Sequence, residues 1–218
     1  MKKNTNNNLT ELVFILDSSG SMTGLESDTV GGFNSMIKKQ RETDGECFVS
    51  TIFFNTRSSV IHDRVKLNKV KKLTEKDYVT TGCTALLDAV GDAIHHIGNI
   101  HKYARREDVP KHTIFVITTD GYENASRKYD YEQIKSLIEK QKKKYGWEFI
   151  FLGANIDAEN VASSIGIDRE FAANYRADSK GTSVAYSNIA TYCCEARSGI
   201  AAPSMWKENI ERDLNERK

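Results

Sequence analysis

Long apolar runs are missing from this chain of 218 residues. No stretch approaches the roughly 18 consecutive apolar residues of a membrane-spanning helix. The start, Met1 to Asn8, is basic but has no apolar region before the first expected strand. We therefore expect no secretory signal, no membrane partner and a cytoplasmic location.

A strong net charge is missing as well. The formal charge is +1, so no attraction of the whole molecule to nucleic acid is expected. The four cysteines, Cys47, Cys83, Cys193 and Cys194, have no metal-ligand spacing, and the adjacent pair is a poor disulfide framework. We expect reduced and mostly buried thiols. The sequence also lacks the glycine-rich G-x-G-x-x-G and G-x-x-x-x-G-K-[ST] patterns of nucleotide-binding proteins.

Apolar segments alternate with helical patterns along the chain, which predicts an α/β fold. We expect a doubly wound, Rossmann-like, mainly parallel six-stranded sheet with one antiparallel edge strand and helices on both faces. Residues 11–198 would form one domain, between a flexible N-terminus at 1–10 and a C-terminal extension at 199–218. The expected strands are 11–16, 48–54, 59–65, 113–119, 147–152 and 171–174. The expected helices are about 30–45, 84–97, 130–146, 158–165, 183–196 and 203–218.

Some helices carry more specific signals. Asp130 followed by Gln133 predicts a helix N-terminus, and Gly146 predicts its end. Gly31-Gly32 indicates close packing of the first helix against the sheet. In the extension, Trp206, Ile210 and Leu214 recur every four residues, which predicts a short amphipathic helix. We expect this helix to pack on its own domain, with partner binding as the alternative.

The most informative segment is Asp17-Ser18-Ser19-Gly20-Ser21, directly after the apolar run Leu12–Leu16. The pattern D-x-S-x-S places oxygen donors in one tight turn, and Mg²⁺ prefers oxygen ligands. Asp120 also ends a strongly apolar strand, and ligands of open parallel sheets gather at the carboxyl ends of strands. We therefore expect Asp17 and Asp120 to converge, with Thr84 contributed by a third loop.

These residues resemble the metal-ion-dependent adhesion site (MIDAS) of von Willebrand factor A domains, the fold of the integrin inserted domain. The resemblance covers about Leu12 to Ala196, within the expected domain at 11–198. It implies that five residues hold Mg²⁺, with Mn²⁺ or Ca²⁺ as alternatives. It also implies a non-enzymatic module in which a Glu or Asp carboxylate of a partner protein completes the coordination of the metal. The five matching residues are Asp17, Ser19, Ser21, Thr84 and Asp120.

Cys83, next to Thr84, departs from the commoner Gly-Gly-Thr form of that loop. We expect it to be a small packed residue, and a redox-sensitive thiol is the alternative.

Three other interpretations remain. Asp17 could cap its loop, with the serines as ordinary turn residues. A metal-dependent phosphohydrolase could use Asp17 as its nucleophile, but such enzymes of the haloacid dehalogenase type need a second aspartate where Ser19 stands. An exported adhesion protein is the third interpretation, which the missing signal and the free cysteines disfavour.

Overall fold

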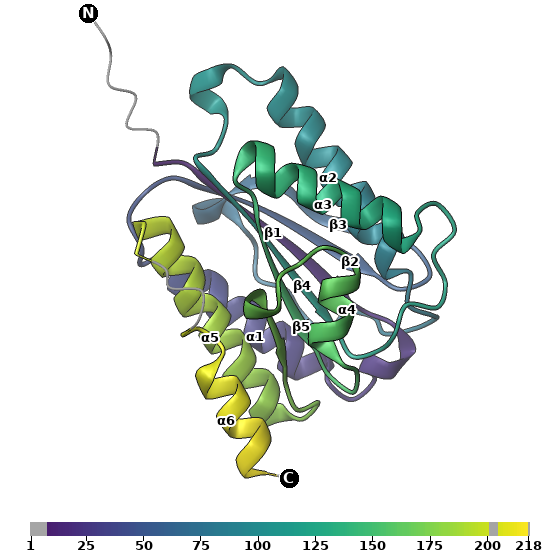
Figure 1. The fold of residues 1–218 in the computed structure, drawn as a ribbon. Helices are drawn as coiled ribbons and strands as arrows, with labels where there is room; N and C mark the ends of the chain where they lie inside the picture. Colours follow the sequence, from purple (N-terminus) through teal and green to yellow (C-terminus); the bar gives the residue numbers. More distant parts are fainter. Residues whose placement is uncertain (1–7, 201–204, 218) are drawn as a thin grey trace, which may run out of the picture.

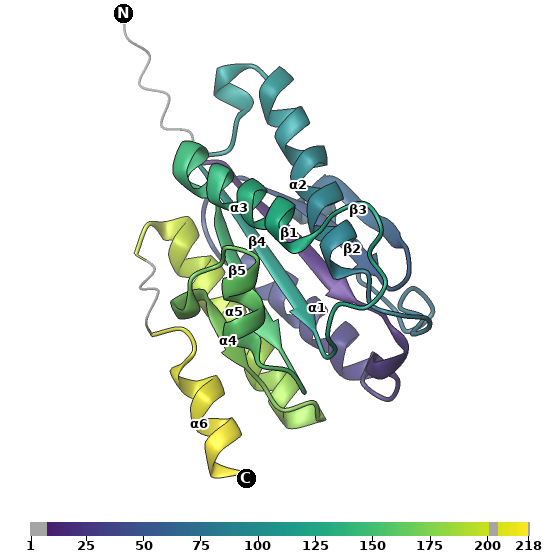
Figure 2. The same ribbon diagram turned by 45° about the vertical axis from the view of Figure 1, so that its right-hand side comes forward.

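A six-stranded sheet forms the centre of the computed structural model, which describes residues 8–200 and 205–217 (Figures 1 and 2). The strands are β1 (Thr10–Asp17), β2 (Cys47–Phe54), β3 (Ser58–Lys66), β4 (His112–Thr119), β5 (Glu148–Gly153) and β6 (Ala172–Asn174). The helices are α1 (Glu26–Gln40), α2 (Leu86–Tyr103), α3 (Tyr131–Tyr145), α4 (Ala158–Ser164), α5 (Ser179–Ser198) and α6 (Glu208–Glu216).

The strand order is β3-β2-β1-β4-β5-β6. Only the edge strand β3 runs antiparallel, paired with β2 as a hairpin, while the other pairs are parallel. The expected fold class is therefore confirmed. The order reverses between β1 and β4, which makes their carboxyl ends the switch point where open α/β sheets bind ligands.

Two apolar cores cover the two faces of the sheet, as the alternation along β1 requires. Leu12, Phe14 and Leu16 face a core shared with α1, α5 and α6. Val13 and Ile15 face the other core, shared with α2, α3 and α4. Because β1 and β4 are buried on both faces, packing holds their ends in position. The loops that follow these strands therefore begin at fixed points.

Several helix ends differ from the sequence-based expectation. Helix α3 has the expected capping box between Asp130 and Gln133 and ends at Gly146 in the left-handed conformation. Helix α5 begins at Ser179, four residues earlier than expected, because Asp178 caps it by accepting a hydrogen bond from Gly181 N at 2.8 Å. Helix α1 ends at Gln40 rather than near residue 45.

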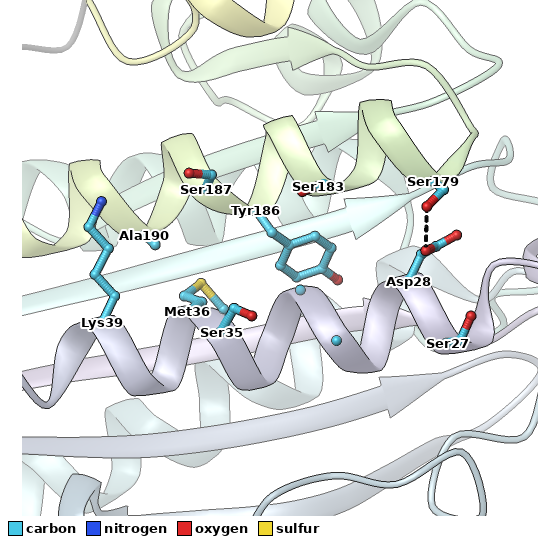
Figure 3. A pocket seen from close by; sticks show the side chains of 12 residues that line it. Ser27, Asp28, Ser35, Met36, Lys39, Ser179, Ser183, Tyr186, Ser187 and Ala190 are labelled. Carbon is cyan, nitrogen blue, oxygen red and sulfur yellow. Dashed lines mark hydrogen bonds between the residues drawn. The ribbon is translucent and has the colours of Figure 1, made fainter.

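The glycine pair of α1 packs against a helix and not against the sheet. A Cβ on Gly32 would lie 2.6 Å from Cγ of Tyr186, so the glycine allows the tyrosine ring of α5 to approach α1. Nothing lies within 4 Å of a Cβ placed on Gly31, which faces an open groove between the two helices (Figure 3). The expected contact with the sheet was therefore wrong.

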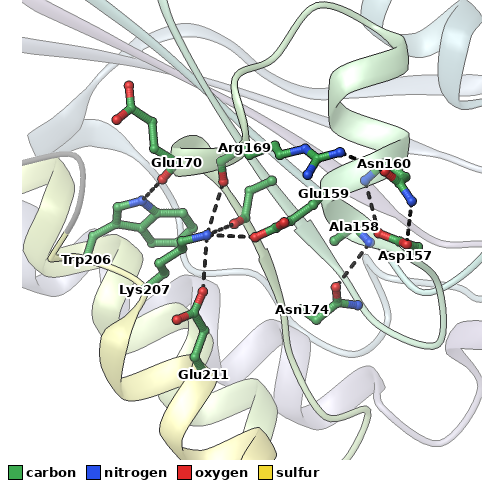
Figure 4. Close-up of polar contacts among 11 residues, drawn as sticks. Asp157, Ala158, Glu159, Asn160, Arg169, Glu170, Asn174, Trp206, Lys207 and Glu211 are labelled. Carbon is green, nitrogen blue, oxygen red and sulfur yellow. Dashed lines mark hydrogen bonds and ion pairs between the residues drawn. The ribbon is translucent and has the colours of Figure 1, made fainter.

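The amphipathic C-terminal helix packs on its own domain. Trp206 is buried and donates from Nε1 to Glu170 O at 2.9 Å (Figure 4). The Lys207 ammonium lies 2.9 Å from Glu159 and 3.1 Å from Glu211, so it joins α6 to α4 (Figure 4). Ile210 is buried as well. The helix thereby covers the side of the short edge strand β6.

The remaining expectations concern the ends of the chain. Of the expected flexible segment 1–10, residues 1–7 lie outside the described residues, and β1 begins at Thr10. Of the expected terminal helix 203–218, residues 203, 204 and 218 lie outside them as well. Within the described part of the chain, no helix is both long and apolar enough to cross a membrane.

Candidate metal centre

Three loops meet at the carboxyl ends of β1 and β4. Asp17 is the last residue of β1, and Asp120 directly follows β4, which pairs with β1 in parallel. The loop before α2 is joined to the loop after β1 by two backbone hydrogen bonds, Gly20 N to Gly82 O at 3.0 Å and Thr81 N to Ser18 O at 2.9 Å. This pairing places Thr84 beside the two strand ends.

The first loop folds around the Asp17 carboxylate. Asp17 is fully buried, and its Oδ1 accepts a hydrogen bond from Ser19 N at 2.7 Å. Oδ2 accepts from the Thr119 hydroxyl at 2.6 Å. Ser19 is also buried, whereas Ser21 is exposed at the mouth of the loop. The chain thus buries the acid and presents hydroxyls above it.

Hydroxyl groups connect the first loop to Asp120. Ser21 Oγ donates to Asp120 Oδ1 at 2.6 Å and lies 3.0 Å from Ser19 Oγ. Since a hydroxyl has one proton, and that of Ser21 goes to the carboxylate, Ser19 donates to Ser21. A Cβ on Gly121 would lie 3.5 Å from both Ser21 Oγ and Thr84 Oγ1, so Thr84 reaches the same place. All five residues singled out in the sequence are brought together.

Burial dominates the electrostatics of this cluster. It raises the pKa of Asp17, and the hydrogen bonds from Thr119 and Ser19 offset part of the rise, while the neighbouring Asp120 adds to it. Burial also raises the pKa of Asp120, partly offset by the hydrogen bond from Ser21. Two adjacent acids that both resist ionisation would be stabilised as carboxylates by a cation beside them.

The donor set fits a hard divalent cation. Neither Asp17 nor Asp120 forms an ion pair with any basic side chain of the described residues. Around them are three hydroxyl oxygens, which would coordinate Mg²⁺ without adding negative charge. Residues 8–200 and 205–217 contain no cluster of three or more His, Cys, Asp or Glu side chains suited to a metal. A centre built from two carboxylates and three hydroxyls is consistent with that finding.

Two residues that support the centre were missed in the sequence. Thr119 holds the Asp17 carboxylate, and the Tyr78 hydroxyl donates to the backbone oxygen of Asp17. Thr119 had a signal in the sequence, because it directly precedes Asp120, which was expected to converge with Asp17; the observed register pairs Leu16 with Thr118 and so brings Thr119 next to Asp17. Tyr78 lies in an irregular connection and carries no local signal.

The four cysteines differ in their burial. Cys47 and Cys193 are buried, Cys194 is half-buried, and none of the four cysteines is in a disulfide. Cys83 is exposed, so the expectation of a packed residue was wrong. Its backbone N donates to Thr56 Oγ1 at 3.0 Å, and the redox-sensitive thiol stays a prediction.

A third set of contacts fixes the loop after β4 on the N-terminus of α2. Glu123 Oε2 accepts from Leu87 N at 2.9 Å, and Asn124 Oδ1 accepts from Thr84 N at 2.9 Å. Asp88 accepts from the backbone N of Lys128 at 2.8 Å. The loop that carries Asp120 is therefore rigidly attached to the segment that carries Thr84.

No protein-family model matches the sequence, and no curated protein matches it. Solved structures do match. The pilus adhesin SpaC from Lactobacillus rhamnosus GG has a TM-score of 0.66 at 12% identity, over 88% of this chain and 30% of that chain. A von Willebrand factor type A protein from Catenulispora acidiphila has a TM-score of 0.57 at 11% identity, over 85% and 42%. Proximal thread matrix protein 1 from the mussel byssus, solved with a zinc-occupied MIDAS motif, has a TM-score of 0.56 at 16% identity, over 85% and 46%.

These similarities establish the fold. The chain has the α/β fold of von Willebrand factor type A domains, with the six-stranded order and the single antiparallel pair described above. It spans less than half the length of each of the three matched chains. The identities are too low to transfer more than the fold.

Proposed function

We propose that this protein is a non-enzymatic protein-binding module that holds a divalent cation. The single observation that carries the proposal is the pair of buried carboxylates, Asp17 and Asp120, that no basic side chain of the described residues neutralises. The bound cation, Mg²⁺ in the first place and Mn²⁺ or Ca²⁺ as alternatives, would supply positive charge and an open coordination position.

The residues of the centre have distinct roles in this proposal. Asp17, held by Ser19 N and Thr119, supplies buried negative charge from below. Ser19, Ser21 and Thr84 offer neutral oxygens, and in this proposal Asp17, whose two oxygens already accept hydrogen bonds, acts through a bound water and not in direct contact, so the cation keeps residual positive charge toward its open position. That charge favours an anionic ligand, and we propose that it is a Glu or Asp carboxylate of a partner protein.

The surroundings of the centre also suit a partner surface. Tyr122, two residues after Asp120, is 55% exposed, and Val79, near the Thr81 contact, is 63% exposed. Exposed aromatic and apolar side chains beside a recognition centre are typical of binding surfaces. A catalytic role for Asp17 is disfavoured, because its carboxylate is fully buried and both of its oxygens accept hydrogen bonds.

Calorimetric titration with Mg²⁺ and Mn²⁺ tests the metal. Wild type is expected to bind one equivalent, whereas Asp17→Ala and Asp120→Ala are expected to lose binding. Asp28→Ala is the matched control, because Asp28 lies in the first turn of α1 near the same loop but outside the centre. Binding that is absent from wild type, or unchanged in both centre variants, contradicts the assignment.

Affinity capture on the full chain, with Mg²⁺ or with chelator, tests the partner. A partner is expected to be retained in Mg²⁺ and lost in chelator. Tyr122→Ala should weaken retention while leaving the metal affinity unchanged, since the Tyr122 side chain is not among the oxygen donors. Retention that is unaffected by chelator would place the partner surface elsewhere.

The fold similarity to a pilus adhesin makes an exported adhesion protein the second candidate function. Cell fractionation separates it from the cytoplasmic location that we propose. Recovery of the protein from the medium or the cell surface, in the absence of lysis, would support adhesion.

A further inference from the structure

A second cavity lies at the end of the molecule opposite the candidate metal centre. It occupies about 350 Å³ between α2 and α3. Pro110 and Trp147 line it just before β4 and β5 begin, so it lies at the amino ends of the strands. Its volume is at the lower end of the range of about 300 to 1,000 Å³ typical of small-molecule sites.

The floor of this α2–α3 cavity is aromatic and is left open by a glycine. Trp147 is buried, stacked on Phe115 at a centroid distance of 5.2 Å and contacted edge-on by His101 at 5.5 Å. A Cβ on Gly98 would lie 3.8 Å from Cη2 of Trp147 and from Nε2 of Gln141. The space in front of the indole therefore exists because residue 98 has no side chain. A flat apolar group fits there.

The walls of the cavity are basic. Lys102 and Lys140 line it, with His95 and His101, and no Asp or Glu is among the described residues that line it. Neither lysine forms an ion pair with a carboxylate of the described residues. Most lysines on a surface are solvated, but two on facing helices around an apolar floor give charge complementarity to an anion.

A buried polar group in the same cavity also lacks a partner. Gln141 is only 8% exposed, and its Oε1 accepts no hydrogen bond from any of the described residues. An unsatisfied buried amide costs about 1 to 3 kcal/mol. Because the oxygen and nitrogen of a glutamine can exchange places by rotation of the amide, the side chain can offer either a donor or an acceptor to a ligand.

We propose that the α2–α3 cavity binds a small organic anion with a flat aromatic body. The body packs against Trp147 over Gly98, and the anionic group lies between Lys102 and Lys140. Gln141 supplies a polar contact at the boundary. This site is independent of the proposed metal centre, which lies at the other end of the same strands.

The probe 3-phenylpropionate, compared with its neutral amide, tests the proposal on the full chain. The chain has two tryptophans, so a Trp206→Phe background leaves Trp147 as the only reporter of tryptophan fluorescence. The acid is expected to change this fluorescence saturably and to bind at least about tenfold more tightly than the amide. Added salt is expected to weaken the binding of the acid. Binding is expected to persist in chelator.

Two kinds of variant locate the site. Gly98→Leu should abolish binding by filling the floor, whereas Gly98→Ala should fold at least as well as wild type, because Gly98 is helical and the added Cβ meets nothing closer than 3.8 Å. The double variant Lys102→Gln, Lys140→Gln should lower the affinity for the acid about tenfold and leave the affinity for the amide unchanged. Lys135→Gln with Lys143→Gln, which removes two charges of α3 that do not line the cavity, is the control.

Three results would overturn the proposal. They are the absence of saturable binding to wild type, equal affinities for the acid and the amide, and unchanged binding in Gly98→Leu while its thermal unfolding is that of wild type. If Gly98→Leu loses both binding and folding, the paired lysine variants decide the question, because their substitutions are on the surface.

Discussion

Replacement of Asp17 by asparagine is expected to have different effects on the metal-free and metal-loaded protein. The asparagine carbonyl can still accept from Ser19 N, which is 2.7 Å from Oδ1 in the wild type. The amide nitrogen would face Thr119 Oγ1, which is 2.6 Å from Oδ2. Thr119 can accept from that amide and donate to Gly121 O, 3.0 Å away. Both contacts are kept, and only the charge is removed.

The direction of the metal-free effect follows from the pKa of Asp17, which burial raises above its ordinary value of 3.8. When a carboxyl group has a higher pKa in the folded state than in the unfolded state, it contributes to the free energy of unfolding at low pH. The full contribution is present below the pKa of the unfolded state. This contribution is lost as the pH rises through the folded pKa. Above the folded pKa, the buried ionised carboxylate therefore lowers the free energy of unfolding. In chelator, Asp17→Asn is expected to be at least as stable as wild type.

The metal-loaded effect has a calculable size. A cation that binds only the folded state stabilises the wild type by about 2.7 kcal/mol at a concentration about 100 times its Kd. For a domain of about 200 residues, this raises Tm by about 5 to 11 °C. The variant is expected to show little of this rise, because it has lost one of the two carboxylates. Differential scanning fluorimetry in chelator and in Mg²⁺ measures both effects.

Asp88→Asn is a suitable control, because Asp88 accepts backbone hydrogen bonds from Lys128 and Tyr129 but lies outside the centre. It should lose stability and keep the full rise in Mg²⁺. A lower stability of Asp17→Asn than of wild type in chelator would mean that the buried charge is stabilising, which contradicts this prediction. A full Mg²⁺ rise in Asp17→Asn would place the cation elsewhere.

Three further predictions concern single contacts. Thr119→Val removes the hydroxyl that donates to Asp17 and should lower the free energy of unfolding by about 1.5 to 3 kcal/mol in denaturant titration, since hydrogen bonds to charged groups have this size. Gly32→Ala should destabilise by about 1 to 3 kcal/mol because its Cβ meets a tyrosine ring of α5 at 2.6 Å, whereas Gly31→Ala, with open space, should be neutral or stabilising. Trp206→Ala should release α6 from the domain. Amide hydrogen exchange should then become faster in α6 and stay unchanged in β4. Equal acceleration in both elements would mean that α6 unfolds only with the whole domain.

The parts of the fold that the sequence predicted are those with strong local patterns. Residues 114–117 are apolar on both faces, which is typical of an interior strand, and β4 lies between β1 and β5. Asp130 and Gln133 specify a capping box without help from the rest of the fold. The convergence of Asp17 and Asp120 was predictable as well, because parallel strands present their carboxyl ends at one edge.

The parts that were missed depend on contacts between distant segments. The start of α5 was obscured by Gly181, which is poor in helices. Its role emerges only in three dimensions, since a Cβ there would lie 2.2 Å from Arg176 O. Arg197 likewise shows its role only in the fold. It is buried and donates to the backbone oxygens of Gln40, at the end of α1, and of Gly45, in the connection to β2.

A comparison within β1 gives the strongest reason to treat the metal centre as functional. Glu11, near the start of the strand, is as fully buried as Asp17, but its two oxygens pair with Arg64 Nε at 2.7 Å and His101 Nε2 at 2.6 Å. Asp17, at the other end, accepts hydrogen bonds from uncharged donors alone within residues 8–200 and 205–217. Burying an uncompensated carboxylate is costly, and sequences retain such costs mainly at functional sites. Because the described residues neutralise one buried acid of β1 with basic side chains and supply none to the other, the positive charge for Asp17 is expected to come from a bound cation.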